Sequence, residues 1–262
     1  MIHFFLNLIV VFSCFHFFTK SVFAQKESSF ENNHNSFNFN SLKTEHVDPF
    51  VKRAFDKPSI GLLLTGTIAS LVTEPEDDHV RSQWKDHQRI NKSDSHIGDI
   101  LGSGAGSLAV MAGQYWLDDN SDHWKSHARG FVYGGIGIYS LKTIFGRNRP
   151  GHSHSHQSFP SGHTAISFMT ATNLAYAYGW PAAAIAYPVA FYVGATRLSD
   201  DAHWFSDTVG GAFLGLWVGR AAFYSSIGEK DTSVVRYLWN EKYQIVPILA
   251  NDQSGLYLSH SF

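Results

Sequence analysis

Residues 160–181 read PSGHTAISFMTATNLAYAYGWP, and this stretch decides the fold. It begins with a proline and a serine, which are typical of the residues just before a helix. It ends with Gly179-Trp180-Pro181, a combination that stops a helix. Residues 164–196, which run through that stop into the next apolar segment, contain no Asp, Glu, Lys or Arg. The stretch therefore predicts an apolar helix over residues 161–179 that is capped by Ser161 and followed at once by another.

Similar segments lie on both sides of this one. They are long, rich in Ala, Gly and aromatic residues, and separated by breaks such as Glu74-Pro75 and Arg149-Pro150. We expect the mixed-charge stretch 74–94 to be a solvated link that can fold over a site. The pattern predicts six helices, and thus an all-α six-helix bundle over residues 49–228. The expected helices cover residues 59–73, 97–117, 129–145, 161–179, 181–197 and 203–225.

The composition excludes some partners and leaves the relation to a membrane open. The 262 residues are 44% hydrophobic, enough for one domain with a sizeable core, and the net charge of −2 implies no basic face for nucleic acid. Only 16% of residues are charged, which suggests closely packed apolar helices in or beside a membrane. Residues 164–196 are long enough for two spans of about 17–25 residues each. The mean hydropathy of −0.13 is nevertheless ordinary for a soluble protein, so we expect membrane association without deciding whether helices span.

The two ends of the chain differ from the middle. Residues 1–24 are apolar from Ile2 to Phe18 and end in small residues, which predicts a signal peptide cleaved after Ala24. A retained anchor and a lipid-modified Cys14 are the alternatives. We expect an exported protein of the periplasm or cell envelope, with an Asn-rich disordered tether over residues 25–48. In the tail, residues 229–262, alternating apolar residues around a turn-rich stretch predict a short β-hairpin.

The first of three polar clusters ends the helix predicted over residues 129–145. Lys142 and Arg149 are seven residues apart, which is two helical turns, and Pro150 ends the helix. Two cations on one face can hold a phosphate, lysine as a point charge and arginine as a bidentate fork. They can also simply complement the helix dipole, and for this pair alone that explanation is the better one.

The second cluster is Ser161-Gly162-His163, at the start of the helix with which we began. Free backbone N–H groups at a helix N-terminus bind anions, and Gly162 lets a ligand approach the backbone closely. Ser161 adds a hydroxyl donor, and His163 can transfer a proton near neutral pH. A plain serine cap explains Ser161 but leaves His163 unexplained.

The third cluster is Arg197, His203 and Asp207. His203 and Asp207 are four residues apart, on one face of the last predicted helix. An aspartate that bonds one imidazole nitrogen fixes the tautomer and leaves the other nitrogen free as a nucleophile or base. Pairs with this spacing are common on solvated helices, so this pair alone is weak evidence.

Taken in order, the clusters are Lys-x6-Arg-Pro, Pro-Ser-Gly-His and Arg-x5-His-x3-Asp. A chain with these motifs on successive helix ends resembles the type 2 phosphatidic acid phosphatase superfamily, which also includes bacterial acid phosphatases and vanadium haloperoxidases. The resemblance covers about residues 50–225. Thr196 replaces the usual serine but keeps a hydroxyl, and the link 151–159 between the first two motifs is short. Neither departure removes a catalytic group.

The resemblance implies a phosphatase that needs no cofactor. His203 would attack phosphorus and form a phosphohistidine, Asp207 would orient His203, and His163 would protonate the leaving oxygen. The substrate would be a phosphate monoester or diphosphate, of a lipid (phosphatidic acid, phosphatidylglycerophosphate, prenyl diphosphate or lipid A) or of a small soluble ester. The resemblance assigns phosphate binding to Lys142, Arg149, Ser161, Gly162 and Arg197.

No metal is expected at this site. His152, His154 and His156 alternate in the loop beside it, and such loops bind metal adventitiously. They lack the spacing and the supporting hydrogen bonds of a catalytic metal centre. The sequence therefore favours a polar loop at the rim of the site.

Several alternatives stay open. A vanadate-dependent haloperoxidase would hold vanadate with the same residues, and a non-specific soluble periplasmic acid phosphatase would use the same chemistry. A non-catalytic helical membrane component predicts gaps in the three motifs, and the sequence has none. Phe159, Trp180 and Trp204 lie near the motifs, where they either line an acyl or prenyl groove or serve as packing residues.

Overall fold

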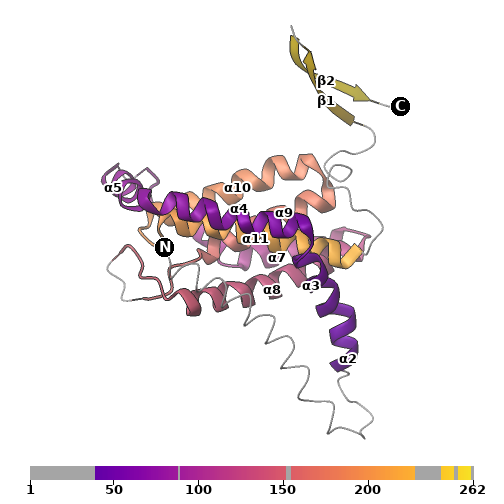
Figure 1. The fold of residues 1–262 in the computed structure, drawn as a ribbon, viewed down its shortest axis with the longest axis horizontal. Helices are drawn as coiled ribbons and strands as arrows, with labels where there is room; N and C mark the ends of the chain where they lie inside the picture. Colours follow the sequence, from indigo (N-terminus) through magenta and orange to yellow (C-terminus); the bar gives the residue numbers. More distant parts are fainter. Residues whose placement is uncertain (1–38, 88, 152–154, 228–242, 251–252, 261–262) are drawn as a thin grey trace, which may run out of the picture.

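The computed structural model of the chain describes residues 39–87, 89–151, 155–227, 243–250 and 253–260. Its main part is a bundle of helices (Figure 1). The predicted signal peptide and residues 25–38 of the predicted tether lie outside the described residues. Residues 39–48, at the end of the segment predicted as a disordered tether, are helical.

The helices run in chain order as follows: α2 (Phe39–Leu42), the π-helical turn η1 (Lys43–Val47), α3 (Asp48–Ala54), α4 (Lys57–Thr73), the 3-10 turn η2 (Glu74–Glu76), α5 (Asp77–His87), α6 (Lys92–Gly102), α7 (Ala105–Leu117), α8 (Ser121–Phe145), α9 (Gly162–Tyr178), α10 (Trp180–Ser199) and α11 (Phe205–Ile227). The predicted all-α class is therefore confirmed, and every segment predicted as helix is helical. The predicted count of six is only approximate, for two local reasons.

The segment 97–117 was predicted as one helix and forms two. Gly104 has a φ of 95°, a left-handed conformation that interrupts the helix between α6 and α7. The link over residues 74–94 is also more ordered than expected, because it contains α5. Two acidic residues in the first turn of α5 and basic residues in its last turn complement the helix dipole.

Beyond the bundle, β1 (Tyr243–Ala250) pairs antiparallel with β2 (Gln253–His260). The register places Tyr243 opposite His260 and Val246 opposite Tyr257. This pairing has the form of the short hairpin that the alternating residues predict.

Helices α9 and α11 form the centre of the bundle (Figure 1). α11 packs against α9, α4, α8 and α3, while α9 also packs against α10 and α8. The two central helices come unusually close: a Cβ atom at Gly215 would lie 2.4 Å from the carbonyl oxygen of Ala165, and one at Gly211 would lie 2.6 Å from that of Ser161. Glycine at these positions therefore lets the start of α9 lie directly against the start of α11.

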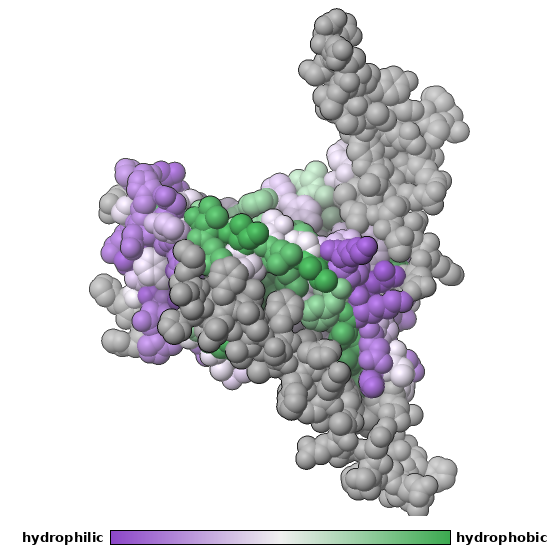
Figure 2. Space-filling view, viewed as in Figure 1, coloured by the Kyte–Doolittle hydropathy of each residue, from purple (hydrophilic) through white to green (hydrophobic). Residues whose placement is uncertain are grey.

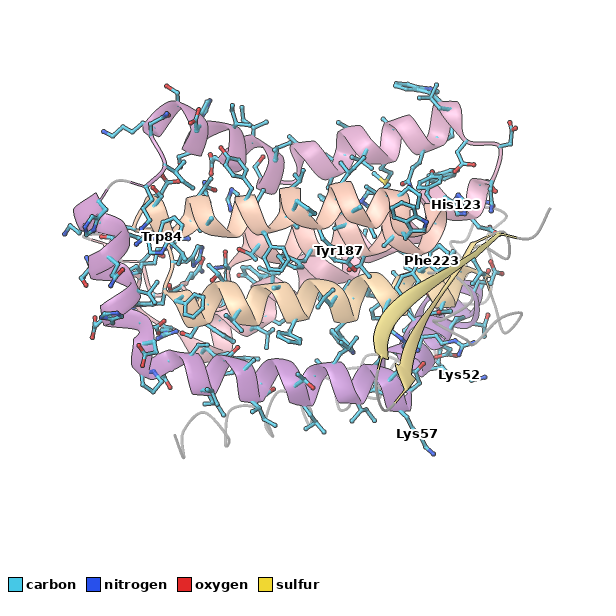
Figure 3. All side chains as sticks on the ribbon, turned by 90° about the horizontal axis from the view of Figure 1, so that it is seen from above. Lys52, Lys57, Trp84, His123, Tyr187 and Phe223 are labelled. Carbon is cyan, nitrogen blue, oxygen red and sulfur yellow. The ribbon has the colours of Figure 1, made fainter. Side chains whose placement is uncertain are left out.

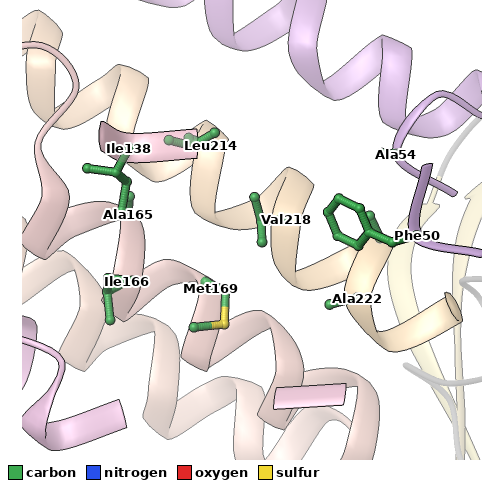
Figure 4. Packing of buried hydrophobic residues seen from close by; sticks show 10 residues of the cluster. Phe50, Ala54, Ile138, Ala165, Ile166, Met169, Leu214, Val218 and Ala222 are labelled. Carbon is green, nitrogen blue, oxygen red and sulfur yellow. The ribbon is translucent and has the colours of Figure 1, made fainter. Parts of the chain in front are cut away.

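The core fills the space around these helices (Figure 4). Phe50 of α3 closes one end of it, stacked on Tyr133 with 3.9 Å between ring centroids. Trp217 Nε1 donates to the Ala54 carbonyl oxygen at 2.7 Å, which fixes α3 on α11. Buried side chains from α3, α8, α9 and α11 make up this core: Phe50, Ala54, Ile138, Ala165, Ile166, Met169, Leu214, Val218, Ala221 and Ala222.

On the face seen in Figure 2, the described surface is hydrophobic in the middle and hydrophilic toward both ends. Trp84 of α5 marks one end and Lys52 and Lys57 mark the other (Figure 3). Along α4, an outward-facing row of apolar residues four positions apart is left exposed, which we call the α4 stripe: Ile60, Leu64, Ile68 and Val72.

Candidate active site

The start of α9 and the start of α11 meet at the end of the bundle that carries α5. Ser161 is the extended residue before α9, and its buried backbone N–H donates to the Asp207 carbonyl oxygen at 3.0 Å. Gly162 follows as the first helical residue. A Cβ atom there would meet only ordinary contacts, the nearest being Ile138 Cγ2 at 3.4 Å. The protein itself does not require glycine at this position, whereas a ligand that approaches the free N–H groups does.

His203 and Asp207 lie together on α11 and the loop before it, almost fully buried. His203 Nδ1 is 3.6 Å from Asp207 Oδ2, just beyond hydrogen-bonding distance, so a small movement would join them. Burial lowers the pKa of His203; the Asp207 carboxylate opposes that shift, and the nearby cations Lys142 and Arg149 add to it. His203 is therefore neutral near pH 7, the form in which an imidazole nitrogen can act as a nucleophile.

Asp207 is held from three directions. Its Oδ2 accepts from Ser158 Oγ at 2.5 Å and from the Trp204 backbone N–H at 2.9 Å, and its Oδ1 accepts from Arg147 at 2.7 Å. Burial opposes ionisation of this carboxyl, yet His203, Arg147 and Ser158 outweigh burial and keep its pKa below the usual value. Asp207 is thus a fixed anion behind His203.

Arg147 connects this anion to α5. Its other terminal nitrogen donates to Asp77 Oδ2 at 2.7 Å, and Asp77 in turn accepts from the Ser206 backbone N–H at 2.8 Å. Asp77 is 5% exposed. The start of α5 is therefore locked onto the start of α11 through one arginine and two buried carboxylates, at the base of the site.

Two cations from the first predicted cluster lie beside this pair. Lys142 Nζ donates to the Gln157 carbonyl oxygen at 2.6 Å. Burial, and then the positive charge of Arg149, lower the pKa of Lys142 to about 8, while Asp207 opposes the shift. The Arg149 Nε atom is buried and has no hydrogen-bond partner within the part of the chain that the structure describes. An unpaired buried donor of this kind fits a site that awaits an anion.

The remaining predicted residues meet across the opening of the site. Arg197 is 4% exposed and donates to Asp99 Oδ1 at 2.6 Å and to Asp200 Oδ2 at 2.9 Å. Asp99 Oδ1 also lies 3.0 Å from His163 Nε2. Burial and then Arg197 lower the pKa of His163 to about 4, against the opposing effect of Asp99.

The structure thus brings together all eight residues singled out in the sequence, and it adds four that the sequence did not reveal. Arg147 stands two residues from Arg149 in the same short stretch, where spacing alone could not tell the two apart. Asp77, Asp99 and Ser158 carry no local signal, because each acts on a residue far away in the chain. Trp204 lies under Arg81 and Arg147, each 5.7 Å from its ring, so it packs at the edge of this network.

The histidine-rich loop is only partly in view, because His152 and His154 lie outside the described residues. Among residues that the structure does describe, no group of three or more His, Cys, Asp or Glu side chains is placed to hold a metal ion. Of the other aromatic residues near the motifs, Phe159 is buried and Trp180 is 54% exposed on α10.

Comparisons with known proteins find similarities over the part of the chain that contains these residues. The model of the PAP2 superfamily matches residues 123–230, a range that contains all eight predicted residues. The lipid A 1-phosphatase of Porphyromonas gingivalis is 37% identical over 105 residues, which are 38% of this chain and 23% of that protein. The chain therefore spans about a quarter of the length of this relative.

A solved structure shares the fold. The crystal structure of Aquifex aeolicus LpxE matches with a TM-score of 0.50 and 24% identity, over 56% of this chain and 93% of that chain. The three motifs lie at the starts of α9 and α11 and at or just beyond the ends of α8 and α10, all within residues 123–230. This part of the chain is therefore similar to the PAP2 superfamily, the type 2 phosphatidic acid phosphatases and their relatives.

Proposed function

We propose that this chain is a phosphatase that hydrolyses the phosphate ester of a lipid through a phosphohistidine intermediate and without a metal ion. The observation that carries the proposal is the convergence of a neutral His203, a fixed Asp207 behind it, and the cations Lys142, Arg149 and Arg197, which are partly or fully buried, near the start of α9. Similarity to a protein named lipid A 1-phosphatase supports a phosphorylated lipid as the substrate class.

In the first step, the free nitrogen of His203 attacks phosphorus while the bond to the ester oxygen breaks, and His163 donates its proton to the leaving alkoxide. In the second step, His163 takes a proton from water, the water attacks the phosphohistidine, and phosphate leaves. Asp207 stabilises the positive charge that develops on His203. The non-bridging oxygens are held by Lys142, Arg149, Arg197, the Ser161 hydroxyl and the Gly162 N–H, which act where charge builds in the transition state.

The neutral state of His203 suits its role in the first step. His163, in contrast, becomes protonated only when the substrate binds. With a pKa of about 4, His163 is neutral in the free protein at pH 7. A phosphate dianion bound beside Arg197 would offset that cation and raise the pKa of His163. Binding of the substrate would therefore prepare the acid that the reaction needs.

We also propose that the protein contacts the apolar phase of a membrane. The four residues of the α4 stripe are 42–68% exposed, and Val132, Ile136 and Tyr139 of α8 are exposed as well. A row of large apolar residues of this kind is rare on a protein surface that only meets water. None of the helices in the described part of the chain is long and apolar enough to cross a membrane. Co-flotation with liposomes tests the contact, and protein that stays in the dense fraction contradicts it.

A panel of substrates tests the function itself. Purified protein should release inorganic phosphate from phosphatidic acid, phosphatidylglycerophosphate, prenyl diphosphate or lipid A, and its rate should be unchanged by EDTA. Loss of activity in EDTA that zinc restores would overturn the metal-free mechanism. Bromide oxidation with vanadate and peroxide, in the absence of phosphate release, would instead favour a haloperoxidase.

The pKa of Lys142 predicts how activity depends on pH. A lysine with a pKa of about 8 loses its charge as the pH rises through 8, so we expect kcat/KM to fall above that pH. Bound phosphate favours the charged form, so the fall in kcat should come at higher pH. Lys142→Arg keeps its charge throughout this range and should remove the fall in kcat/KM. Lys125→Arg, an exposed position on the same helix, is the matched control. The same fall of kcat/KM at alkaline pH in the wild type, Lys142→Arg and Lys125→Arg would contradict the prediction.

A further inference from the structure

An apolar cavity lies beside the site, between α4, α8 and α11. It measures about 150 Å³, and Ile136, which is half exposed, borders it. Its far end is closed by large apolar rings, and its near end lies against the segment that leads into α9. The residues that matter for the argument are Phe50 and Trp217 at the far end, and Ser70, Phe159, Pro160 and Gly210 at the near end.

The near end of the cavity borders the active site directly. Pro160 lines the cavity, and the next residue, Ser161, is in the site. Phe159 packs edge-on against Phe145, with 4.9 Å between ring centroids. Phe145 is the last residue of α8, less than one turn beyond Lys142. Phe145 and Phe159 both line the cavity, so this aromatic pair connects the end of α8 that carries Lys142 with the cavity.

One polar atom stands out in the apolar lining. Ser70 Oγ is buried and finds no hydrogen-bond partner among the described residues. It lies at the near end, because a Cβ atom at Gly210 would be 3.0 Å from Ser70 Oγ and 2.6 Å from the Phe159 ring. An unpaired buried hydroxyl is costly unless something bonds to it. The cavity therefore has a polar donor near the phosphate and hydrocarbon surface farther away, which is the polarity of an acyl chain and its linkage.

We propose that this cavity binds one hydrocarbon chain of the phosphorylated substrate, with Ser70 Oγ as donor to the carbonyl oxygen where that chain is attached. The inference rests on the proposed function and goes beyond it, because it names the part of the lipid that is recognised. The exposed α4 stripe runs along the outer side of the helix that forms one wall, so a chain can enter from an apolar phase without crossing water. A cavity of about 150 Å³ accommodates a ligand the size of benzene, or about six carbons.

Chain length provides the test. Linear alkyl phosphates from ethyl to dodecyl, below their micelle concentrations, should show kcat/KM rising about fourfold per methylene for about six methylenes, and then levelling. Gly137 lines the cavity from α8, and a Cβ atom there would come no closer than 4.0 Å to Leu214. Gly137→Leu should therefore fill the cavity without a clash and flatten the rise, while activity on ethyl phosphate stays within about twofold.

Gly135→Leu is the matched control, because Gly135 lies on the same helix, is exposed, and has no atom within 4 Å of its Cβ position. It should keep the full dependence on chain length. If Gly137→Leu lowers the unfolding temperature, Ile136→Trp at the exposed edge of the cavity replaces it as the blocking variant. A blocking variant with the same chain-length dependence as the wild type would overturn the inference.

Ser70→Ala tests the hydrogen bond to the carbonyl oxygen separately from binding of the hydrocarbon chain. It should lower kcat/KM between about twofold and tenfold for phosphates that carry an acyl ester and leave alkyl phosphates unchanged. Equal effects on both classes would contradict the hydrogen bond to the carbonyl oxygen. Phosphate release that is independent of chain length in the wild type would overturn the cavity inference alone, whereas no release from any ester would overturn the proposed function and the inference with it.

Discussion

Replacing His203 with alanine should reduce phosphate release by about 10⁴–10⁶-fold, because the reaction loses the atom that attacks phosphorus. His203 is 4% exposed and sits against an ionised, buried Asp207. His163 is also a neutral imidazole beside a carboxylate, but its partner Asp99 is 47% exposed, whereas Asp207 is fully buried. The measurement is the rate of phosphate release, together with an unfolding curve that shows whether the variant keeps its fold. Appreciable turnover by a folded His203→Ala protein would rule out His203 as the nucleophile.

His163→Ala is the control that separates the nucleophile from the acid. With a good leaving group such as p-nitrophenol, loss of the acid should slow the first step little, so labelled phosphate should still become attached to the protein. Breakdown of the phosphohistidine should slow, because His163 also activates the water. His203→Ala should take up no label from the same substrate. Label on the His203→Ala protein would place the covalent bond elsewhere.

Replacing Arg147 with methionine should lower the free energy of unfolding by about 3 kcal/mol. The change leaves the carboxylates of Asp77 and Asp207 without their shared cation, and these side chains are 7% and 0% exposed. Arg147 itself is 26% exposed, so we expect the lower end of the range for a broken buried pair. Activity should fall as well, because Asp207 loses one of the contacts that fix it behind His203. Denaturant unfolding followed by tryptophan fluorescence measures the stability change.

Arg81→Met is the matched control. Arg81 also forms a close two-bond pair with a carboxylate, with 2.6 and 2.8 Å to the oxygens of Asp201. Both side chains are about a quarter exposed, and pairs that water reaches contribute about 0–1 kcal/mol. Equal losses of unfolding free energy in Arg147→Met and Arg81→Met would show that burial of Asp207 and Asp77 does not determine the loss of stability.

The sequence predicted the fold well where local signals control it. Ser161 is the extended residue before α9, as predicted, although its side chain makes no capping hydrogen bond, and Gly179 with a φ of 76° ends the helix after Tyr178. Such backbone signals act over a few residues. Two features of the fold were missed because the local sequence does not mark them. The interruption at Gly104 needs a left-handed residue that the composition of an apolar, glycine-rich segment does not single out, and α5 is a polar helix without an apolar periodicity to mark it.

The eight predicted residues show the same division. Their types and spacing were visible because each motif is a short stretch of sequence, and the structure brings the three stretches to one place. Arg149 lies in the loop after α8, not on the predicted helix, and the third motif runs from the end of α10 to the start of α11. Their roles in catalysis stay predictions until the variants are measured. For Phe159, by contrast, the sequence left two roles open, lining a groove or packing in the core. Only the structure shows that Phe159 is buried and lines the cavity between α4, α8 and α11.

The sequence alone therefore determined the helical class, the order of the motifs and the set of candidate phosphate-binding residues. The tertiary structure decided which carboxylate holds which cation: Arg147 with Asp77, 70 residues away, and Arg197 with Asp99, 98 residues away. These pairs depend on how closely α9, α10 and α11 pack and on where α5 and α6 then come to lie. Spacing along a chain reports which side chains share one helix face, but it carries no information on which helices become neighbours.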